Sequence, residues 1–139
     1  MMLNNNLLAG VQAAYRGHRI YDTDETKAMV KDSIAVYKKY RAIFESPAVK
    51  IRRPDGRDFD GYVHVNPELC EKGMLVLFNP LGEEITRTIR VPLYYTGLTE
   101  TAEFARFDTE PFTCELARDY TVTLTVTIPA NDFVWYTIR

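Results

Sequence analysis

The sequence predicts a mainly β protein: an antiparallel β-sandwich of about seven or eight strands preceded by two N-terminal helices. Two observations carry this prediction. Residues 121–128 alternate threonine with an aliphatic residue, which is the period of a strand with one apolar face. From Pro47 onward, short apolar segments recur about every ten residues with turn-forming residues between them, as in a sandwich.

The N-terminal part reads as two helices. Leu7, Leu8 and Val11 fall at helical spacing, continued by Ala14 and Tyr15, and predict a first helix over about residues 5–15 that ends near Gly17. Capping residues at 22–25 predict the start of a second helix that reaches about residue 44. Pro47 prevents further helix, so we divide the chain into a helical segment, 1–46, and a β-sandwich domain, 47–139.

The second helix carries an apolar face about half its circumference wide. Met29, Val36 and Ile43 repeat every seven residues on this face, and Tyr40 widens it. One small helix would not cover so wide a face, so we expect it to lie against a sheet or a larger body. These four residues are therefore the candidate interface, either with another domain or with a second copy of the chain.

The strands are predicted over residues 48–52, 62–65, 73–78, 84–91, 102–107, 112–116, 121–128 and 133–138. Residues 73–78 are apolar without alternation, as expected of a central strand covered on both faces. In the strand 121–128, the aliphatic residues should face the core and the threonines should face outward. Loops are predicted at 94–97 and 108–111.

Composition limits the possible partners. The 139 residues suit one domain, and a net charge of -2 lacks the basic excess of a nucleic-acid surface. No apolar stretch approaches the roughly 20 residues of a membrane span, and the N-terminus does not resemble a signal peptide. We therefore expect neither nucleic acid nor a membrane as partner. The compartment stays open: cytoplasmic if the chain is complete, periplasmic or secreted if it is a fragment of an exported protein.

No motif indicates a catalytic residue, a metal site or a cofactor. Cys70 and Cys114 are too few for a zinc site and are expected to be buried free thiols, with one disulfide as the alternative. His18 and His64 are expected to have surface or packing roles. Asp55, Asp58 and Asp60 alternate with Arg52, Arg53 and Arg57, which favours a solvated hairpin tip over a structural ion pair or a calcium site.

Three aromatic residues are candidates for carbohydrate binding. Tyr94 and Tyr95 lie in a predicted loop, and Trp135 lies in a predicted strand. Aromatic rings stack on the apolar face of a pyranose, so an exposed group of them could bind a sugar. A core position remains the simpler interpretation of Trp135, whereas the two tyrosines suit either role.

Several segments resemble the C-terminal region of α-galactosidase-like (melibiase-clan) glycoside hydrolases, as found in large bacterial glycosidase-like proteins. The resemblance spans most of the chain, from Tyr15-Arg16-Gly17 through Tyr21-Asp22-Thr23 and Val36-Tyr37-Lys38-Lys39-Tyr40-Arg41 to Arg52-Arg53-Pro54-Asp55-Gly56-Arg57-Asp58, His64-Val65-Asn66-Pro67, Leu75-Val76-Leu77-Phe78-Asn79-Pro80 and Val91-Pro92-Leu93-Tyr94-Tyr95-Thr96-Gly97-Leu98. It implies the last helix of a catalytic (β/α)8 barrel followed by the β-sandwich domain.

The resemblance also implies what the chain does. The catalytic carboxylates of such enzymes sit on the barrel, and a barrel of roughly 250 residues does not fit ahead of residue 1. No catalytic residue is therefore carried over, and the chain is not expected to be an enzyme by itself. The implied role is a non-catalytic accessory domain that packs against and stabilises a catalytic barrel absent from this chain. The alternative is a stand-alone carbohydrate-binding module that uses Tyr94, Tyr95 and Trp135.

Overall fold

The computed structural model describes residues 2–11, 21–106 and 109–139, and within them the protein is mainly β. The helices are α1 (Met2–Leu8), α2 (Asp24–Lys39) and α3 (Arg41–Phe44). The strands are β1 (Ala48–Arg52), β2 (Asp60–Val65), β3 (Gly73–Phe78), β4 (Ile85–Pro92), β5 (Thr101–Arg106), β6 (Thr109–Glu115), β7 (Thr121–Ile128) and β8 (Phe133–Ile138). A short 3-10 turn, η1 (Tyr94–Thr96), follows β4.

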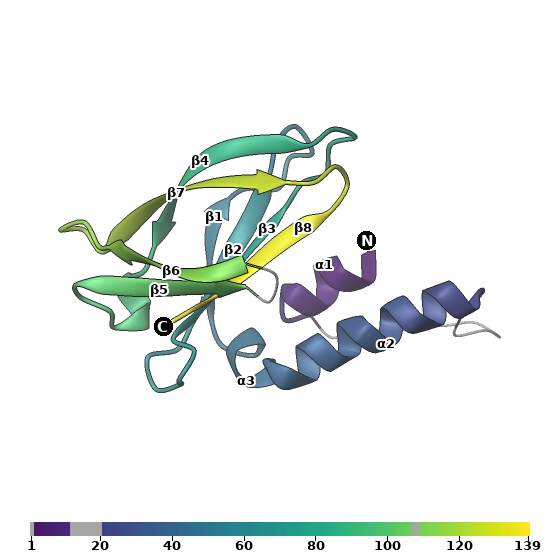
Figure 1. Ribbon diagram of the computed structural model, residues 1–139, viewed down its shortest axis with the longest axis horizontal. Helices are drawn as coiled ribbons and strands as arrows, with labels where there is room; N and C mark the ends of the chain where they lie inside the picture. The colour runs from purple at the N-terminus through teal and green to yellow at the C-terminus, as the bar shows by residue number, and fades with distance from the viewer. Residues whose placement is uncertain (1, 12–20, 107–108) are drawn as a thin grey trace.

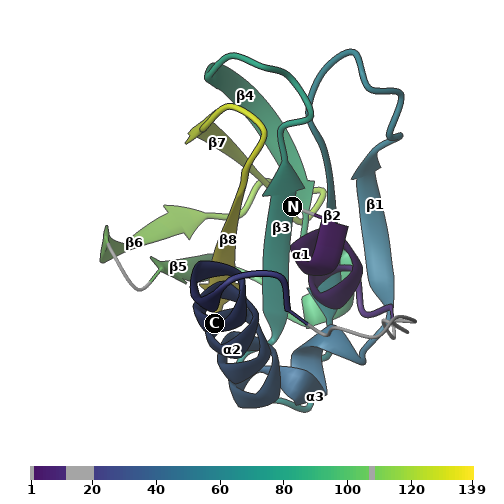
Figure 2. The same ribbon diagram turned by 90° about the vertical axis from the view of Figure 1, so that its right-hand side faces the viewer.

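The described strands form two antiparallel sheets, which confirms the predicted fold class. Six strands pair in the order β1-β2-β3-β8-β5-β6, and β4 pairs with β7 in a separate two-stranded sheet. Figure 1 shows β4 and β7 on one side of the larger sheet, and Figure 2 shows the helices over its other side. The fold therefore has three layers, with apolar side chains between each pair of layers.

The threonine-rich strand β7 has the bounds and the orientation that its sequence predicts. Its four aliphatic residues are buried in the main core between the two sheets, opposite Leu75 and Leu77 of β3. The threonines face outward, where the hydroxyl of Thr127 hydrogen-bonds that of Thr86 on β4 at 2.9 Å. Threonine hydroxyl groups on β4 and β7 thus form hydrogen bonds with one another across the outer surface of the two-stranded sheet.

The central strand β3 is buried on both faces, as its continuous apolar sequence predicts. Leu75 and Leu77 belong to the main core. Met74, Val76 and Phe78 point the other way, into a second core under the helices. The second core is completed by Leu8, Ile43, Phe44 and Trp135.

The long second helix is broken, which corrects the prediction of a continuous helix to residue 44. Helix α2 ends at Lys39, Tyr40 has φ -110° and ψ 21°, and α3 begins at Arg41. No glycine or proline occurs between residues 24 and 46, so no local signal marks the break. The packing explains it: the break turns Ile43 and Phe44 into the second core, while Tyr40 lies against the edge of Trp135 with ring centroids 5.4 Å apart.

Helix α1 is shorter at its C-terminal end than predicted, because it stops at Leu8. Gly10 has φ +72°, and the amides of Gly10 and Val11 donate to the carbonyls of Leu7 and Asn6. This is a Schellman C-cap, which needs glycine at the left-handed position. A Cβ on Gly10 would lie 2.4 Å from the carbonyl oxygen of Phe44, so α1 also packs closely on α3 here. The predictions for Ala14, Tyr15, Gly17 and His18 lie outside the described residues.

Smaller corrections concern the ends of strands. Strand β6 begins at Thr109, so residues 109–111 are strand where the sequence predicts a turn. Pro111 is tolerated because β6 is an edge of the six-stranded sheet. Strand β2 begins two residues earlier than predicted, at Asp60.

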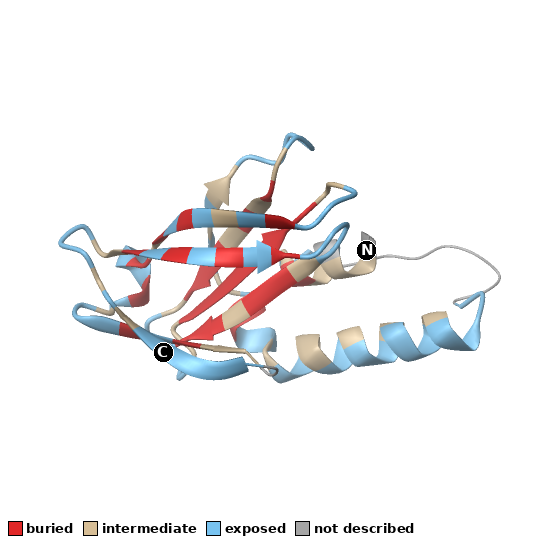
Figure 3. Cartoon of the chain, turned by 45° about the horizontal axis from the view of Figure 1, so that its top comes forward, coloured by how far each residue is buried: buried red, intermediate tan, exposed pale blue. Residues whose placement is uncertain are grey.

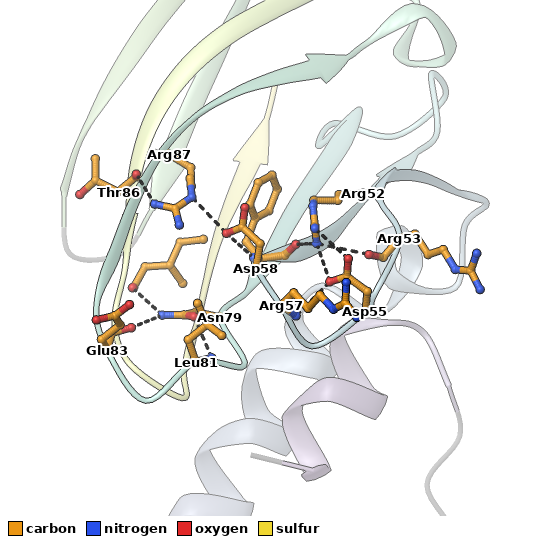
Figure 4. Close-up of polar contacts among 12 residues, drawn as sticks. Arg52, Arg53, Asp55, Arg57, Asp58, Asn79, Leu81, Glu83, Thr86 and Arg87 are labelled. Atoms are coloured by element: carbon orange, nitrogen blue, oxygen red, sulfur yellow. Dashed lines mark hydrogen bonds and ion pairs between the residues drawn. The ribbon is translucent and has the colours of Figure 1, made fainter.

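Buried Asn79 joins two turns at one end of the sandwich (Figure 4). Its side-chain amide donates to the carbonyls of Glu83, Ile128 and Pro129 at 2.8 to 3.2 Å, and its Oδ1 accepts from the amide of Leu81. The turn after β3 is thereby tied to the turn after β7. A buried side chain that both donates and accepts hydrogen bonds in this way fixes how the two sheets meet at this end.

Candidate functional surfaces

The four predicted interface residues do not share one environment, because Met29 and Val36 lie on α2, Tyr40 at the break and Ile43 on α3. Ile43 is only 2% exposed and lies in the second core, so it is not part of an exposed patch. Val36 and Tyr40 are partly buried and pack against the same core. Met29 is 42% exposed. The exposed apolar residues of α2 are therefore Met29 and, past the middle of the helix, Ile34. Five residues turn a helix by about 140°, so the two side chains lie on opposite flanks of its partly buried face.

Helix α2 is anchored at its C-terminal end and passes beside α1 at its middle. The structure describes all 16 of its residues, and none of them is buried. At its C-terminal end, Tyr37 stacks on Phe44 at 5.8 Å and Tyr40 lies against Trp135. Figure 3 shows the remainder of the helix extending past the sheet with most of its surface exposed. An amphipathic helix left uncovered in this way is typical of a surface that another body covers.

A cleft of about 290 Å³ separates the helices from β8. Leu7 and Leu8 of α1, Val36 of α2 and Trp135 of β8 supply apolar surface. Polar and remaining lining groups are Asn4, Asp32, Ser33, Arg106, Asp132, Phe133 and Val134. The cleft therefore lies between the inner face of α2 and strand β8.

Trp135 is not a surface ring. It is 7% exposed, belongs to the second core and forms part of the wall of the cleft. The position matches the core interpretation of its sequence and does not provide the exposed stacking surface considered for carbohydrate binding. Trp135 also lies apart from Tyr94 and Tyr95, because it faces the helical layer and shares no pocket with either tyrosine.

Tyr94 and Tyr95 are exposed, which is one of the two roles that the sequence left open for them. Each is 63% exposed in η1, and their rings meet edge to face with centroids 5.2 Å apart. A third ring, that of Tyr120, lies 5.5 Å from Tyr94. Tyr95 also borders a groove that Tyr94 does not line, so the two tyrosines differ in what they could contact.

The groove beside Tyr95 has a volume of about 510 Å³. It is lined by residues from three separate segments: Pro47 and Val49 at the start of β1, Val65 to Glu68 at the end of β2 and in the loop after it, and Tyr95 in η1. Sequence reasoning found Tyr95 but not the groove, because no local pattern shows that these segments meet.

The tip of the charged hairpin after β1 is exposed over residues 53–57, as the sequence favours, and ion pairs lie within and beside it (Figure 4). Arg52 donates to both carboxylate oxygens of Asp55 and to the carbonyl of Phe59. Arg87 of β4 reaches across to Asp58, with Nε 3.0 Å from Oδ1. The hydrogen bond from Arg52 holds the pKa of Asp55 below its usual value, whereas burial raises the pKa of Asp60. The ion pair between Arg87 and Asp58 links the hairpin to the two-stranded sheet.

His64 has a packing role, as expected. It is buried in β2, its Nε2 lies 2.8 Å from the Leu8 carbonyl oxygen, and its ring meets Phe44 edge to face. Cys70 and Cys114 are free, but Cys70 is exposed and Cys114 is partly buried, which corrects the expectation of two buried thiols. Among the described residues, no group of three or more histidine, cysteine, aspartate or glutamate side chains is placed to hold a metal ion. Nor is any described helix long and apolar enough to cross a membrane.

Comparison with known proteins gives a likeness of fold. No family model and no curated protein sequence matches the chain. Among solved structures, the chain is similar to a candidate alpha-N-acetylgalactosaminidase from Bacillus halodurans, with a TM-score of 0.61 and 13% sequence identity. The match covers 99% of this chain and 29% of the Bacillus halodurans protein, so the chain spans less than a third of that protein's length. At this identity the likeness shows the fold alone.

Proposed function

We propose that the chain is a non-catalytic accessory β-sandwich domain of a glycosidase-like protein, which packs against a catalytic domain and stabilises it. The observation that carries the proposal is the uncovered apolar surface of α2 beside an otherwise well-filled double core. The likeness to under a third of a candidate glycosidase supports the same role, because it matches this chain to a part of a larger protein.

We place the docking surface around Met29, with half-buried Val30 beside it and exposed Ile34 on the far flank of the same helix. The contacts of Tyr37 and Tyr40 hold the other end of the helix, so this surface is presented in a fixed orientation. Both side chains are already more than half covered, so a partner that buries Met29 and Ile34 gains about 1 kcal/mol for each. An isolated helix of this length is marginal in water, so the partner would in turn stabilise α2.

The test begins with the coding sequence that surrounds the chain. A (β/α)8 domain is expected in the same reading frame or in an adjacent gene, and its absence from both would contradict the proposal. Where that domain exists, sedimentation should show it associating with the 139-residue chain. Met29→Glu should weaken the association about tenfold, because it places a charge in an apolar contact.

Lys31→Glu is the matched control. Lys31 is exposed on the polar side of the same helix, so its reversal should change the association by less than about twofold. Equal effects of Met29→Glu and Lys31→Glu would contradict docking through the apolar surface. The alternative partner of α2 is a second copy of the chain, and sedimentation of the chain alone tests it. A dimer that Met29→Glu dissociates would show that the partner is a second copy and not a catalytic domain.

A further inference from the structure

We propose that the groove beside Tyr95 is a binding site for a neutral saccharide, whose pyranose ring stacks on Tyr95 and whose hydroxyl groups meet the carboxylate of Glu68. The site does not depend on the docking role of α2, because no residue lines both this groove and the cleft beside α2.

The size and the composition of the groove suit a small ligand. Its volume of about 510 Å³ falls within the range of roughly 300–1,000 Å³ that is typical of ligand pockets. The lining is mostly apolar, with Pro47, Val49, Val65 and Pro67 on its surface and few polar groups. Such a lining buries the C–H surface of a ligand, while the few polar groups set its orientation.

The walls of the groove are held in place by contacts behind them. The hydroxyl of buried Thr96 donates to the Leu93 carbonyl and accepts from the Leu98 amide, which fixes the turn that carries Tyr95. Gly97 has φ +76°, and a Cβ there would lie 3.3 Å from Cβ of Pro67. The turn therefore rests directly on the loop after β2, so the two walls keep their spacing.

The opposite wall is fixed as well. Asn66 donates from Nδ2 to the Ser46 hydroxyl and accepts at Oδ1 from the Glu68 amide. Lys72 Nζ donates to the Pro67 carbonyl at 2.7 Å. These contacts hold the backbone of Glu68 at the edge of the groove and leave its carboxylate for a ligand.

The side chains of Tyr95 and Glu68 identify the class of ligand. The Tyr95 ring is largely exposed although it borders the groove, and it joins an apolar face to a polar hydroxyl. Among the described lining residues, Glu68 is the only charged one, and a carboxylate accepts hydrogen bonds from hydroxyl donors. A polyhydroxylated ring with an apolar face matches both groups, whereas a phosphate or carboxylate ligand would meet the negative charge of Glu68 with no cation among the described lining residues.

An extended peptide is the competing occupant, since β1 is an edge strand and the groove is rich in proline. Glu68 and the hydroxyl of Tyr95 favour the saccharide, because a peptide that pairs with β1 would use its backbone and need neither group. The two occupants are therefore separated by their dependence on Tyr95 and Glu68.

The experiment is an NMR titration of the ¹⁵N-labelled 139-residue chain with methyl α-galactoside, methyl α-glucoside and N-acetylgalactosamine, each to about 10 mM. Fluorescence of Trp135 would not report this site, because that ring faces the helical layer. We expect amide shifts at residues 65–68 and 95–97 with at least one sugar and a Kd on the order of 1 mM. A separate titration with a proline-rich decapeptide tests the competing occupant.

The variants compare neighbouring tyrosines. Tyr95→Ala should weaken binding about tenfold, and Glu68→Gln should weaken it by a few-fold. Tyr94→Ala is the matched control: Tyr94 is equally exposed in the same turn but does not line the groove, so binding should change by less than about twofold. The spectrum of each variant reports whether it is folded. If Tyr95→Ala is unfolded, Tyr95→Phe, which keeps the ring, shows what the hydroxyl contributes, and Glu68→Gln tests the site.

Three results would overturn the site. The first is the absence of shifts in the groove with all three sugars. The second is unchanged sugar affinity in Tyr95→Ala or, where that variant is unfolded, unchanged affinity in Glu68→Gln. The third is peptide binding in the groove without sugar binding. None of these results bears on docking through α2, which sedimentation measures separately.

Discussion

The Nε2 atom of His64 lies 2.8 Å from the carbonyl oxygen of Leu8, so a side chain of β2 closes the end of α1. The Schellman cap satisfies the carbonyls of Asn6 and Leu7 but leaves that of Leu8 without a partner inside the helix. The His64 ring donates to it from a buried position. One hydrogen bond therefore links the first helix to the sheet across 56 positions of sequence.

His64→Leu should destabilise the protein by about 1–3 kcal/mol, because it leaves the buried carbonyl of Leu8 unpaired. His64→Gln should recover part of this loss, since its amide group can still donate. Urea unfolding followed by the fluorescence of Trp135, which shares the second core with Leu8, measures both variants. Equal losses in the two variants would show that the hydrogen bond is not what stabilises α1.

Gly10 should be intolerant of any side chain. Gly10→Ala places a Cβ 2.4 Å from the Phe44 carbonyl oxygen and forces alanine to keep φ +72°. Gly56→Ala is the matched control, because Gly56 has φ +70° but no atom within 4 Å of its added Cβ. The control should lose about 1–2 kcal/mol from backbone conformation alone, and Gly10→Ala should lose clearly more. Thermal unfolding would contradict the packing of α1 on α3 if both variants lost the same stability.

The two cysteines should differ in reactivity. Cys70 is exposed, whereas burial raises the pKa of the Cys114 thiol and so lowers its thiolate fraction at neutral pH. Under native conditions, a thiol reagent should modify Cys70 several-fold faster than Cys114, and unfolding in urea should remove the difference. Mass spectrometry after short labelling times distinguishes the two sites. Faster labelling of Cys114 would contradict the arrangement of β5 and β6 that covers it.

Strands were predictable where one residue pattern determined both period and burial. The alternation in β7 places each of its side chains correctly, because only one face of that strand is covered. The helix break at Tyr40 was not predictable, because no local residue signal marks it. Its cause is the packing of Tyr40 against Trp135 and of Ile43 and Phe44 into the second core. Tertiary packing overrode a strong helical period there.

The candidate surfaces show the same division. Met29 and Tyr95 were identified because each carries its signal in its own residue type and neighbourhood. The groove needed Pro47, Val65 and Pro67 to meet, and their approach depends on the pairing of β1 with β2 and on the turn before β5. Arg87 and Asp58 are likewise 29 positions apart, so their ion pair has no local pattern.

The charged hairpin should give two opposite dependences of stability on pH. Burial raises the pKa of Asp60 in the folded protein, so the favourable contribution of its neutral form is present at low pH and is lost as pH rises through the folded pKa. Asp60→Asn should therefore raise the unfolding temperature at pH 7 and leave it unchanged near pH 3. The gain should stay below about 1 kcal/mol because the side chain is partly solvated.

Asp55 should behave in the opposite way, since the hydrogen bond from Arg52 lowers its pKa and stabilises the ionised form. Its contribution is present above the unfolded pKa and is lost as pH falls through the folded value, so Asp55→Asn should lower the unfolding temperature at pH 7 and not at low pH. Calorimetry of both variants between pH 3 and pH 7 tests the pair, and variant effects of the same sign would contradict the placement of Asp60 in β2 and of Asp55 beside Arg52.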